Sequence, residues 1–150
     1  MLEVGQPFPS FSLSDQDGNI VSNHDLLGSK AVIFFYPKDD TPGCTIEACE
    51  FRDAADSYGG ARVLGVSPDS PKSHLKFIKK FKLTYTLLSD VDKSLCEACG
   101  LWVEKSFMGK KYMGVDRTTY LLDASGNIEH IWTKVKPLGH SKEVRDQLAK

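Results

Sequence analysis

Apolar residues in this chain gather into short runs of strand length, separated by segments of helical character. The run "AVIFFY" over residues 31–36 is continuously apolar, which is typical of a central strand buried on both faces. "RVLGVS" over 62–67 predicts a second buried strand, and "YTLLSD" over 85–90 predicts a short strand or extended piece. The pattern therefore predicts a sheet whose faces are both covered.

Helices are expected between and after these strands, because each intervening segment carries helix boundary signals. The expected helices cover residues 45–59, ended by Gly59 and Gly60; residues 71–81, with Ser70 as the cap and Pro71 at the first position; residues 91–99, stopped by Gly100; and residues 141–150, which are amphipathic.

Two β-hairpins complete the predicted layout. One covers residues 11–22, with Asp17-Gly18-Asn19 as its turn, and the other covers 117–133, with the turn at 124–127. This order predicts an α/β fold with a central mixed sheet flanked by helices. A thioredoxin-like arrangement with an N-terminal β-hairpin fits, although the order of elements alone also fits other three-layer folds. At 150 residues, we expect one domain over 1–150.

Composition and charge narrow the classes of function. The chain is 41% hydrophobic and 26% charged, with a formal net charge of −1, so nothing favours nucleic acid or an anionic membrane surface. No apolar run approaches the roughly 20 residues that span a bilayer, and the N-terminus lacks the features of a signal peptide. We therefore expect a cytoplasmic protein, in which four cysteines serve as reduced thiols, redox groups or metal ligands rather than as a disulfide scaffold.

The stretch "PKDDTPGCTIEAC" over residues 37–49 carries the candidate chemistry. Cys44 falls where a buried strand has ended and a helix is about to begin, and the unpaired N–H groups of a helix N-terminus favour a thiolate over a thiol. Pro42 and Gly43 are expected in the loop that enters the helix, where glycine allows close approach of a substrate. Thr41 carries a hydroxyl that could point at the sulfur or at a bound oxygen.

At these residues the sequence resembles a known family. Pro37-x-x-x-Thr41-x-x-Cys44 is similar to the active-site motif of peroxiredoxins, and "FYPKDDTPGCTIEACEFRD" with residues 106–132 resembles their bacterioferritin comigratory protein, or peroxiredoxin Q, branch. The resemblance implies a thioredoxin-like fold and thiol-dependent reduction of hydrogen peroxide and organic hydroperoxides.

The resemblance also implies roles for individual residues. Cys44 would be the peroxidatic cysteine, in a pocket shaped by Pro37, Gly43 and Thr41. Arg117 would be the arginine beside the sulfur, whose permanent charge favours the thiolate and stabilises the leaving oxygen. Glu47, one turn after Cys44, would orient that arginine. No cofactor and no metal are implied.

Cys49 matches the resolving cysteine that this branch often carries five residues after the peroxidatic one. On an intact helix, positions i and i+5 have Cα atoms about 8.6 Å apart, beyond the roughly 6.8 Å limit for a disulfide. We therefore expect the first turns of this helix to unwind in each cycle. A thioredoxin-like dithiol protein would then reduce the disulfide, and the branch resemblance suggests a monomer.

Alternatives remain open at this stage. Cys96 and Cys99 form a CxxC sequence, which we interpret mainly as structural thiols, with a secondary redox role or half of a zinc site as alternatives. The competing functions are a non-catalytic thiol redox sensor and a thioredoxin-like disulfide reductase. The four histidines are expected on the surface. The region with Phe107, Met108 and Tyr112 is expected as a pocket wall or an exposed loop.

Overall fold

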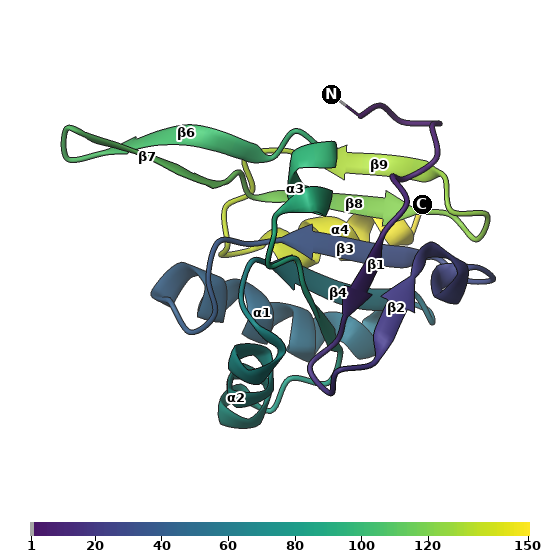
Figure 1. Ribbon diagram of the computed structural model, residues 1–150. Coiled ribbons are helices and arrows are strands. Elements are labelled where there is room, and N and C mark those ends of the chain that lie inside the picture. Colours follow the sequence, from purple (N-terminus) through teal and green to yellow (C-terminus); the bar gives the residue numbers. More distant parts are fainter. Residues whose placement is uncertain (1) are drawn as a thin grey trace.

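The computed structural model describes residues 2–150 and contains a seven-stranded mixed sheet with helices on both faces (Figure 1). The strand order is β2-β1-β5-β4-β3-β8-β9. The three central strands are parallel, and β8 pairs antiparallel with β3. The strands of the sheet are β1 (Ser12–Ser14), β2 (Ile20–Ser22), β3 (Ala31–Phe35), β4 (Arg62–Ser67), β5 (Thr86–Ser89), β8 (Thr118–Leu122) and β9 (Ile128–Trp132).

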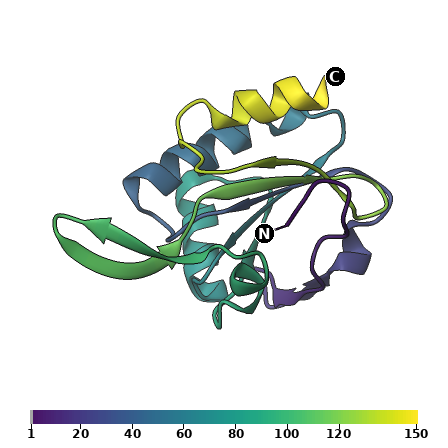
Figure 2. The ribbon, with the colours of Figure 1, turned by 90° about the horizontal axis from the view of Figure 1, so that it is seen from above.

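Four α-helices and two short 3-10 helices connect these strands. Seen from above, α1 and α4 cover one face of the sheet, while α3 and the N-terminal segment lie on the other (Figure 2). None of the helices within residues 2–150 is long and apolar enough to cross a bilayer. The helices are η1 (Asn23–Leu26), α1 (Pro42–Ala54), η2 (Ala55–Ser57), α2 (Pro71–Phe81), α3 (Ser94–Ala98) and α4 (His140–Leu148).

Strand β3 divides the core into two halves. All of its residues are buried, and alternate side chains point to opposite faces because the side-chain period of a strand is two. Val32 and Phe34 belong to the cluster that also contains Phe51 of α1, whereas Ile33 and Phe35 belong to the cluster on the other face. This confirms the predicted central strand, and it places the end of β3 directly before the loop that leads into α1.

The predicted hairpins and the cap of α2 are confirmed. β1 pairs with β2, and β8 with β9. The Ser70 hydroxyl accepts a hydrogen bond from the Ser73 amide, so Ser70 caps α2 as expected.

Helix α1 differs from its prediction at both ends. It begins at Pro42, so Pro42 and Gly43 lie in its first turn and not in the preceding loop. The fixed φ of proline is already helical and its missing N–H has no intrahelical acceptor at this position, which suits it to begin a helix. The α-helical part ends at Ala54 and continues as η2 to Ser57, two residues before Gly59.

A third hairpin, formed by β6 (Trp102–Phe107) and β7 (Lys110–Val115), projects from the body of the molecule (Figure 1). The sequence analysis treated this region as a loop or pocket wall. The hairpin was missed because its side chains are mostly exposed, which removes the inside–outside alternation by which strands are recognised. Phe107 and Met108 are 68% and 88% exposed, so they line no pocket.

Candidate active site

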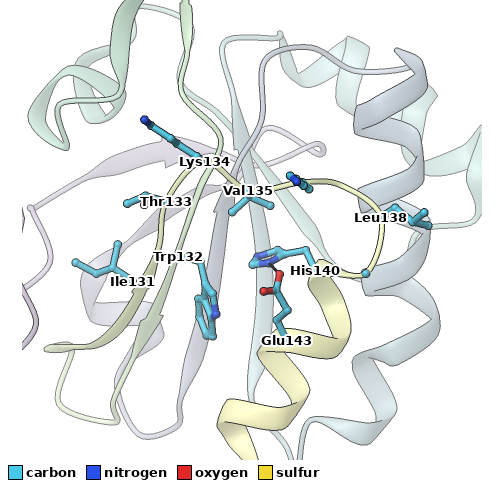
Figure 3. Close-up of a pocket in the computed structure, with 10 residues that line it drawn as sticks. Ile131, Trp132, Thr133, Lys134, Val135, Leu138, His140 and Glu143 are labelled. Atoms are coloured by element: carbon cyan, nitrogen blue, oxygen red, sulfur yellow. Dashed lines mark hydrogen bonds and ion pairs between the residues drawn. The ribbon is translucent and has the colours of Figure 1, made fainter.

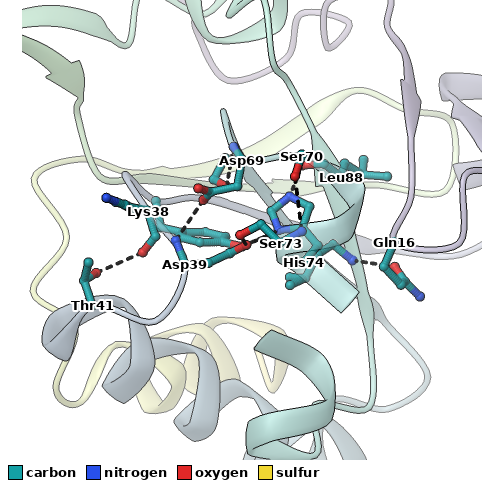
Figure 4. A network of polar contacts seen from close by, with 12 residues as sticks. Gln16, Lys38, Asp39, Thr41, Asp69, Ser70, Ser73, His74 and Leu88 are labelled. Carbon is teal, nitrogen blue, oxygen red and sulfur yellow. Dashed lines mark hydrogen bonds and ion pairs between the residues drawn. The ribbon is translucent and has the colours of Figure 1, made fainter. Parts of the chain in front are cut away.

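The loop between β3 and α1 is held by a buried polar network around Asp39 (Figure 4). One carboxylate oxygen of Asp39 accepts from the Tyr36 hydroxyl at 2.5 Å. The other lies 2.7 Å from Nδ1 of His74 and accepts from the Ser73 hydroxyl at 2.8 Å. The Asp39 amide donates to Asp69 at 2.8 Å. These bonds join the loop to α2 and β4, and they fix the start of α1.

Asp39, Asp69 and His74 are also the described residues that come close enough to share a metal ion, with ligand atoms within 4.8 Å of one another. Each of these groups is hydrogen-bonded within the protein, and the network has a clear structural use. We therefore assign it to holding the loop.

Two of the four histidines are buried, which corrects the expectation that all lie on the surface. His74 has a hydrogen-bond partner at each ring nitrogen, Asp39 at Nδ1 and the Leu88 carbonyl at Nε2, 3.0 Å away. His140 lies 2.8 Å from the Thr119 hydroxyl, and burial lowers its pKa. Both were missed because the segments that bury them, with Asp39 and Thr119 as partners, are distant in sequence. The other two histidines are exposed or half-buried.

Cys44 lies in the first turn of α1 and is buried, with 1% of its surface exposed. The first N–H groups of a helix have no intrahelical acceptor, so they and the helix dipole present positive charge to this sulfur. Cys44 belongs to the apolar cluster that contains Ala48 and Phe51. The Cys44 thiol is therefore shielded from water and lies in a region of positive electrostatic potential.

Arg117 completes this setting, because its Nη2 lies 3.1 Å from the Cys44 sulfur. Arg117 directly precedes β8, which pairs with β3, so the sheet brings it to the sulfur across 73 positions of sequence. Its side chain is 19% exposed, so the guanidinium is largely shielded from water. A permanent positive charge at this distance favours the thiolate. The structure brings together the cysteine and the arginine that the sequence analysis named.

Gly43 permits this approach. A Cβ atom at this position would lie 3.1 Å from Nη2 of Arg117 and 3.5 Å from Cγ of Pro137. The backbone here is helical, so the glycine is needed for space and not for an unusual φ. Pro137 belongs to the loop before α4, a neighbour of the site that the sequence did not indicate.

Glu47 lies one turn after Cys44 with 1% of its surface exposed, and its Oε1 accepts from Nη1 of Arg117 at 3.4 Å. Its other carboxyl oxygen has no hydrogen-bond partner among the described residues. Burial raises the pKa of Glu47 to about 7, even though the charge of Arg117 acts in the opposite direction. One terminal nitrogen of Arg117 thus contacts the Cys44 sulfur, and the other contacts the Glu47 carboxyl group.

Thr41 is the N-cap of α1, and its hydroxyl donates to the Lys38 carbonyl at 2.9 Å. We expected this hydroxyl to point at the sulfur or at a bound oxygen. In the structure its hydrogen is engaged by the loop, which leaves its lone pairs to accept from an incoming donor. Pro37 lies half-buried at the start of the same loop.

Cys49 lies on the same helix and is partly exposed, with its thiol free. Nη1 of Arg52 lies 3.6 Å from its sulfur. The sequence analysis did not single out Arg52, although positions three apart on a helix are neighbours and this spacing could have indicated it.

Cys96 and Cys99 lie on the opposite face of the sheet from Cys44, in the other core cluster. Each has 1% of its surface exposed, and burial raises the pKa of both thiols to about 12. A zinc site shared with Cys44 and Cys49 is therefore wrong, because the sheet separates the two pairs. Their burial also fits structural thiols better than a redox pair.

A hollow of about 560 Å³ opens between the end of β9 and the start of α4 (Figure 3). Trp132, Val135 and His140 line it, and Glu143 lies at hydrogen-bonding distance from His140. Cys44 and Arg117 are not among its lining residues. We therefore separate it from the chemistry of the sulfur.

Comparison with known proteins identifies the family of this chain. Residues 4–131 match the model of the AhpC/TSA family, and the chain belongs to this family of peroxiredoxins. It is therefore a thiol-dependent peroxidase by class, and the predicted family and fold are confirmed.

Similar proteins include several that are named as Bcp or PrxQ peroxiredoxins. A putative peroxiredoxin bcp of Coxiella burnetii is 50% identical over 98% of this chain and 99% of its own length, and peroxiredoxin Bcp of Escherichia coli is 46% identical over 98% and 96%. The bacterioferritin comigratory protein of Xanthomonas campestris superposes with a TM-score of 0.90 at 37% identity, over 98% of both chains. A Xylella fastidiosa PrxQ variant gives 0.93 at 33%, over 99% and 96%.

Proposed function

We propose that this chain reduces hydrogen peroxide and organic hydroperoxides, with Cys44 as the peroxidatic cysteine and Cys49 as the resolving one. The observation that carries the proposal is the 3.1 Å contact between Arg117 and the buried Cys44 sulfur at the start of α1. Organic substrates are supported by the Xanthomonas campestris relative, which is described as reducing alkyl peroxides.

In the first step the Cys44 thiolate attacks one peroxide oxygen, the O–O bond breaks, and a sulfenic acid forms. Arg117 stabilises the negative charge that develops on the leaving oxygen, because its donors already point at the sulfur. The Thr41 hydroxyl oxygen accepts a hydrogen bond from the hydroperoxide, since its own hydrogen is held by the Lys38 carbonyl. The leaving oxygen takes up the proton that the Cys44 thiol released on ionising, so water or an alcohol is the product.

In the second step the Cys49 sulfur condenses with the sulfenic acid to form a disulfide. Both cysteines lie on α1, where residues five apart have Cα atoms about 8.6 Å apart, so the first turns of α1 unwind to bring the sulfurs together. A thioredoxin-like dithiol protein then reduces the disulfide by exchange. We place this cycle in the cytoplasm, where such donors are kept reduced, and in a single-domain monomer spanning residues 1–150.

The test is intact mass and peptide mapping of the reduced protein after one equivalent of hydrogen peroxide. We expect the loss of two hydrogens, mapped to a Cys44–Cys49 bridge. A bridge between Cys96 and Cys99, with Cys44 untouched, would overturn the assignment and favour the disulfide reductase. The Cys44→Ser variant is the control and should consume no peroxide.

Turnover separates the enzyme from a redox sensor. With excess peroxide and a recycling dithiol, an enzyme consumes many equivalents of peroxide per chain. Consumption that stops at one equivalent, while the Cys44–Cys49 disulfide is efficiently reduced, would favour the sensor.

A further inference from the structure

Arg52 joins the candidate resolving cysteine to a neighbouring element. Its Nη1 lies 3.6 Å from the Cys49 sulfur and donates to the Phe81 carbonyl, at the end of α2, at 2.6 Å. Its Nε donates to Asp53 at 2.9 Å. The guanidinium is thus held in place from three sides, and one nitrogen is shared between the sulfur and the carbonyl.

Arg52 keeps its positive charge at neutral pH. The hydrogen bond with Asp53 raises the pKa of Arg52 above its usual value, and the sulfur of Cys49 acts in the same direction. With 30% of its side chain exposed, Arg52 is only partly solvated, so its field at the sulfur is not fully screened. A fixed positive charge beside a thiol favours the thiolate.

We propose that Arg52 is a catalytic residue of the resolving step, holding the Cys49 sulfur as a thiolate ready to attack the sulfenic acid on Cys44. This inference rests on the proposed function of Cys49. The Cys49 sulfur forms a bond to the Cys44 sulfur, and the S–O bond of the sulfenic acid breaks. The leaving hydroxide takes up the proton that Cys49 gave away, so the products are a disulfide and water.

The contact with Arg52 raises the fraction of Cys49 thiolate more than it lowers the intrinsic nucleophilicity of that thiolate. The thiolate is the nucleophile, and its fraction at neutral pH rises as positive charge stabilises it. Intrinsic nucleophilicity falls only about half as steeply as basicity. Stabilising the thiolate therefore speeds the attack at neutral pH, as long as part of the thiol is still protonated.

The position of Arg52 also survives the unwinding that the cycle needs. Its anchor, the Phe81 carbonyl, lies outside α1. The Tyr85 hydroxyl donates to the Ala48 carbonyl at 2.7 Å, which fixes the residue before Cys49 from the same direction. When the first turns of α1 open, Cys44 moves while the thiolate and its guanidinium stay in place.

The experiment is a single turnover of the full chain with one equivalent of hydrogen peroxide, followed by rapid quenching and mass analysis. We expect Arg52→Met to slow disulfide formation about tenfold at neutral pH, the cost of one charge-assisted hydrogen bond, without slowing the formation of sulfenic acid. Arg52→Lys should recover part of the rate. In Arg52→Met the rate should keep rising into alkaline pH, beyond the point where the natural chain levels off.

The matched control is Arg62→Met, because Arg62 also donates to a backbone carbonyl, that of Asp25, at 2.6 Å but far from any cysteine. It should leave the rate unchanged. In a Cys44→Ser background, Arg52→Met should also slow the reaction of Cys49 with iodoacetamide at neutral pH, which tests the contact even if the variant is less stable.

The outcomes separate this inference from the proposed function. If the natural chain forms no Cys44–Cys49 disulfide, the proposed function fails, and the inference with it. If the disulfide forms, and neither its rate nor the alkylation of Cys49 changes in Arg52→Met, only the role of Arg52 is overturned. A slower rate with an unchanged pH profile would also overturn it, since that indicates a merely structural contact.

Discussion

The guanidinium of Arg117 contacts two different side chains. One nitrogen lies against the Cys44 sulfur and the other against the Glu47 carboxyl, so a change at either neighbour moves the same guanidinium. Since the donors must point at the position where charge develops, small displacements have a large effect on rate. The residues around Arg117 therefore offer direct tests.

We predict that Gly43→Ala slows the reaction of Cys44 with hydrogen peroxide by about tenfold, less than the hundredfold or more expected for outright loss of a charge-stabilising donor. The added methyl group would lie 3.1 Å from Nη2 of Arg117, so the guanidinium must shift from its present position beside the sulfur. Stopped-flow kinetics of the first step measure this. Gly114→Ala is the control, because its Cβ would meet only flexible side chains of the β6–β7 hairpin. Equal rates in all three proteins would contradict the prediction.

Glu47 makes the stability of the fold depend on pH. Its pKa is raised from 4.5 to about 7 in the folded chain, so between these values the folded state keeps a proton that the unfolded state releases. The stabilisation is complete below about pH 4.5 and is lost as the pH rises through 7. Ionisation of Glu47 therefore lowers the free energy of unfolding, by a total on the order of 3 kcal/mol.

We predict that Glu47→Gln removes this dependence, because the amide carries no charge at any pH. Urea unfolding of both proteins at pH 5, 6, 7 and 8 measures it. The free energy of unfolding of Glu47→Gln minus that of the natural chain should increase as the pH rises. A constant difference across the series would show that folding does not raise the pKa of Glu47 into this window.

Individual site residues could be predicted from the sequence only where a local pattern or a family motif contains them. Cys44 follows from a strand end, a stiff turn and a helix start, and Arg117 followed from family resemblance. The network around Asp39 and the Thr41–Lys38 bond were not predictable. The partners of Asp39 on Asp69 and His74 become neighbours only after the fold forms. Thr41 and Lys38 are close in sequence, but their bond depends on the conformation of the loop, which no spacing encodes.

At the scale of elements, the proposed cycle requires α1 to be both stable and able to open. Its first turn contains glycine, which weakens a helix, and the Thr41 side chain makes no capping hydrogen bond. Its later part is fixed to neighbouring segments through Ala48 and Arg52. The helix is thus weak where Cys44 must move and held where Cys49 must stay.

We predict that oxidation exposes the amides of residues 44–49 to exchange, while those after Arg52 stay protected. Hydrogen exchange with mass spectrometry on the reduced and oxidised proteins measures this, together with a loss of helix signal in circular dichroism. Peptides from α2 serve as the internal control. In Tyr85→Phe, which loses the bond to the Ala48 carbonyl, the exposed region should extend further along α1. Unchanged protection over 44–52 on oxidation would disprove the unwinding.

Elements were predictable where burial gives them a clear pattern. The buried strands and the capped helix α2 fall where the sequence analysis expected them. The β6–β7 hairpin was missed because it stands away from the core, and its tight turn contains Met108 with φ of 51°, an unusual residue for that conformation. The end of α1 was misplaced because Gly59 follows a 3-10 turn and not the α-helix itself.

At the scale of the whole molecule, all the groups named for the two proposed steps come from one chain. Arg117 contacts Cys44 and Glu47, Arg52 contacts Cys49, and all of these residues except Arg117 lie on α1. We predict that peroxidase activity per chain is constant over a wide range of protein concentration, and that light scattering gives the mass of one chain. Activity that falls on dilution would indicate that a second copy completes the site.

The seven-stranded sheet has a further consequence for the oxidised protein. Because it stands between Cys44 and the pair Cys96 and Cys99, a sulfenic acid formed on one face has no native route to the thiols on the other. Of the four thiols, only Cys49 lies on the same helix as Cys44. In the proposed cycle the sheet thus prevents pairing of Cys44 with Cys96 or Cys99. Repeated oxidation would then return the chain to the Cys44–Cys49 disulfide without the help of an isomerase.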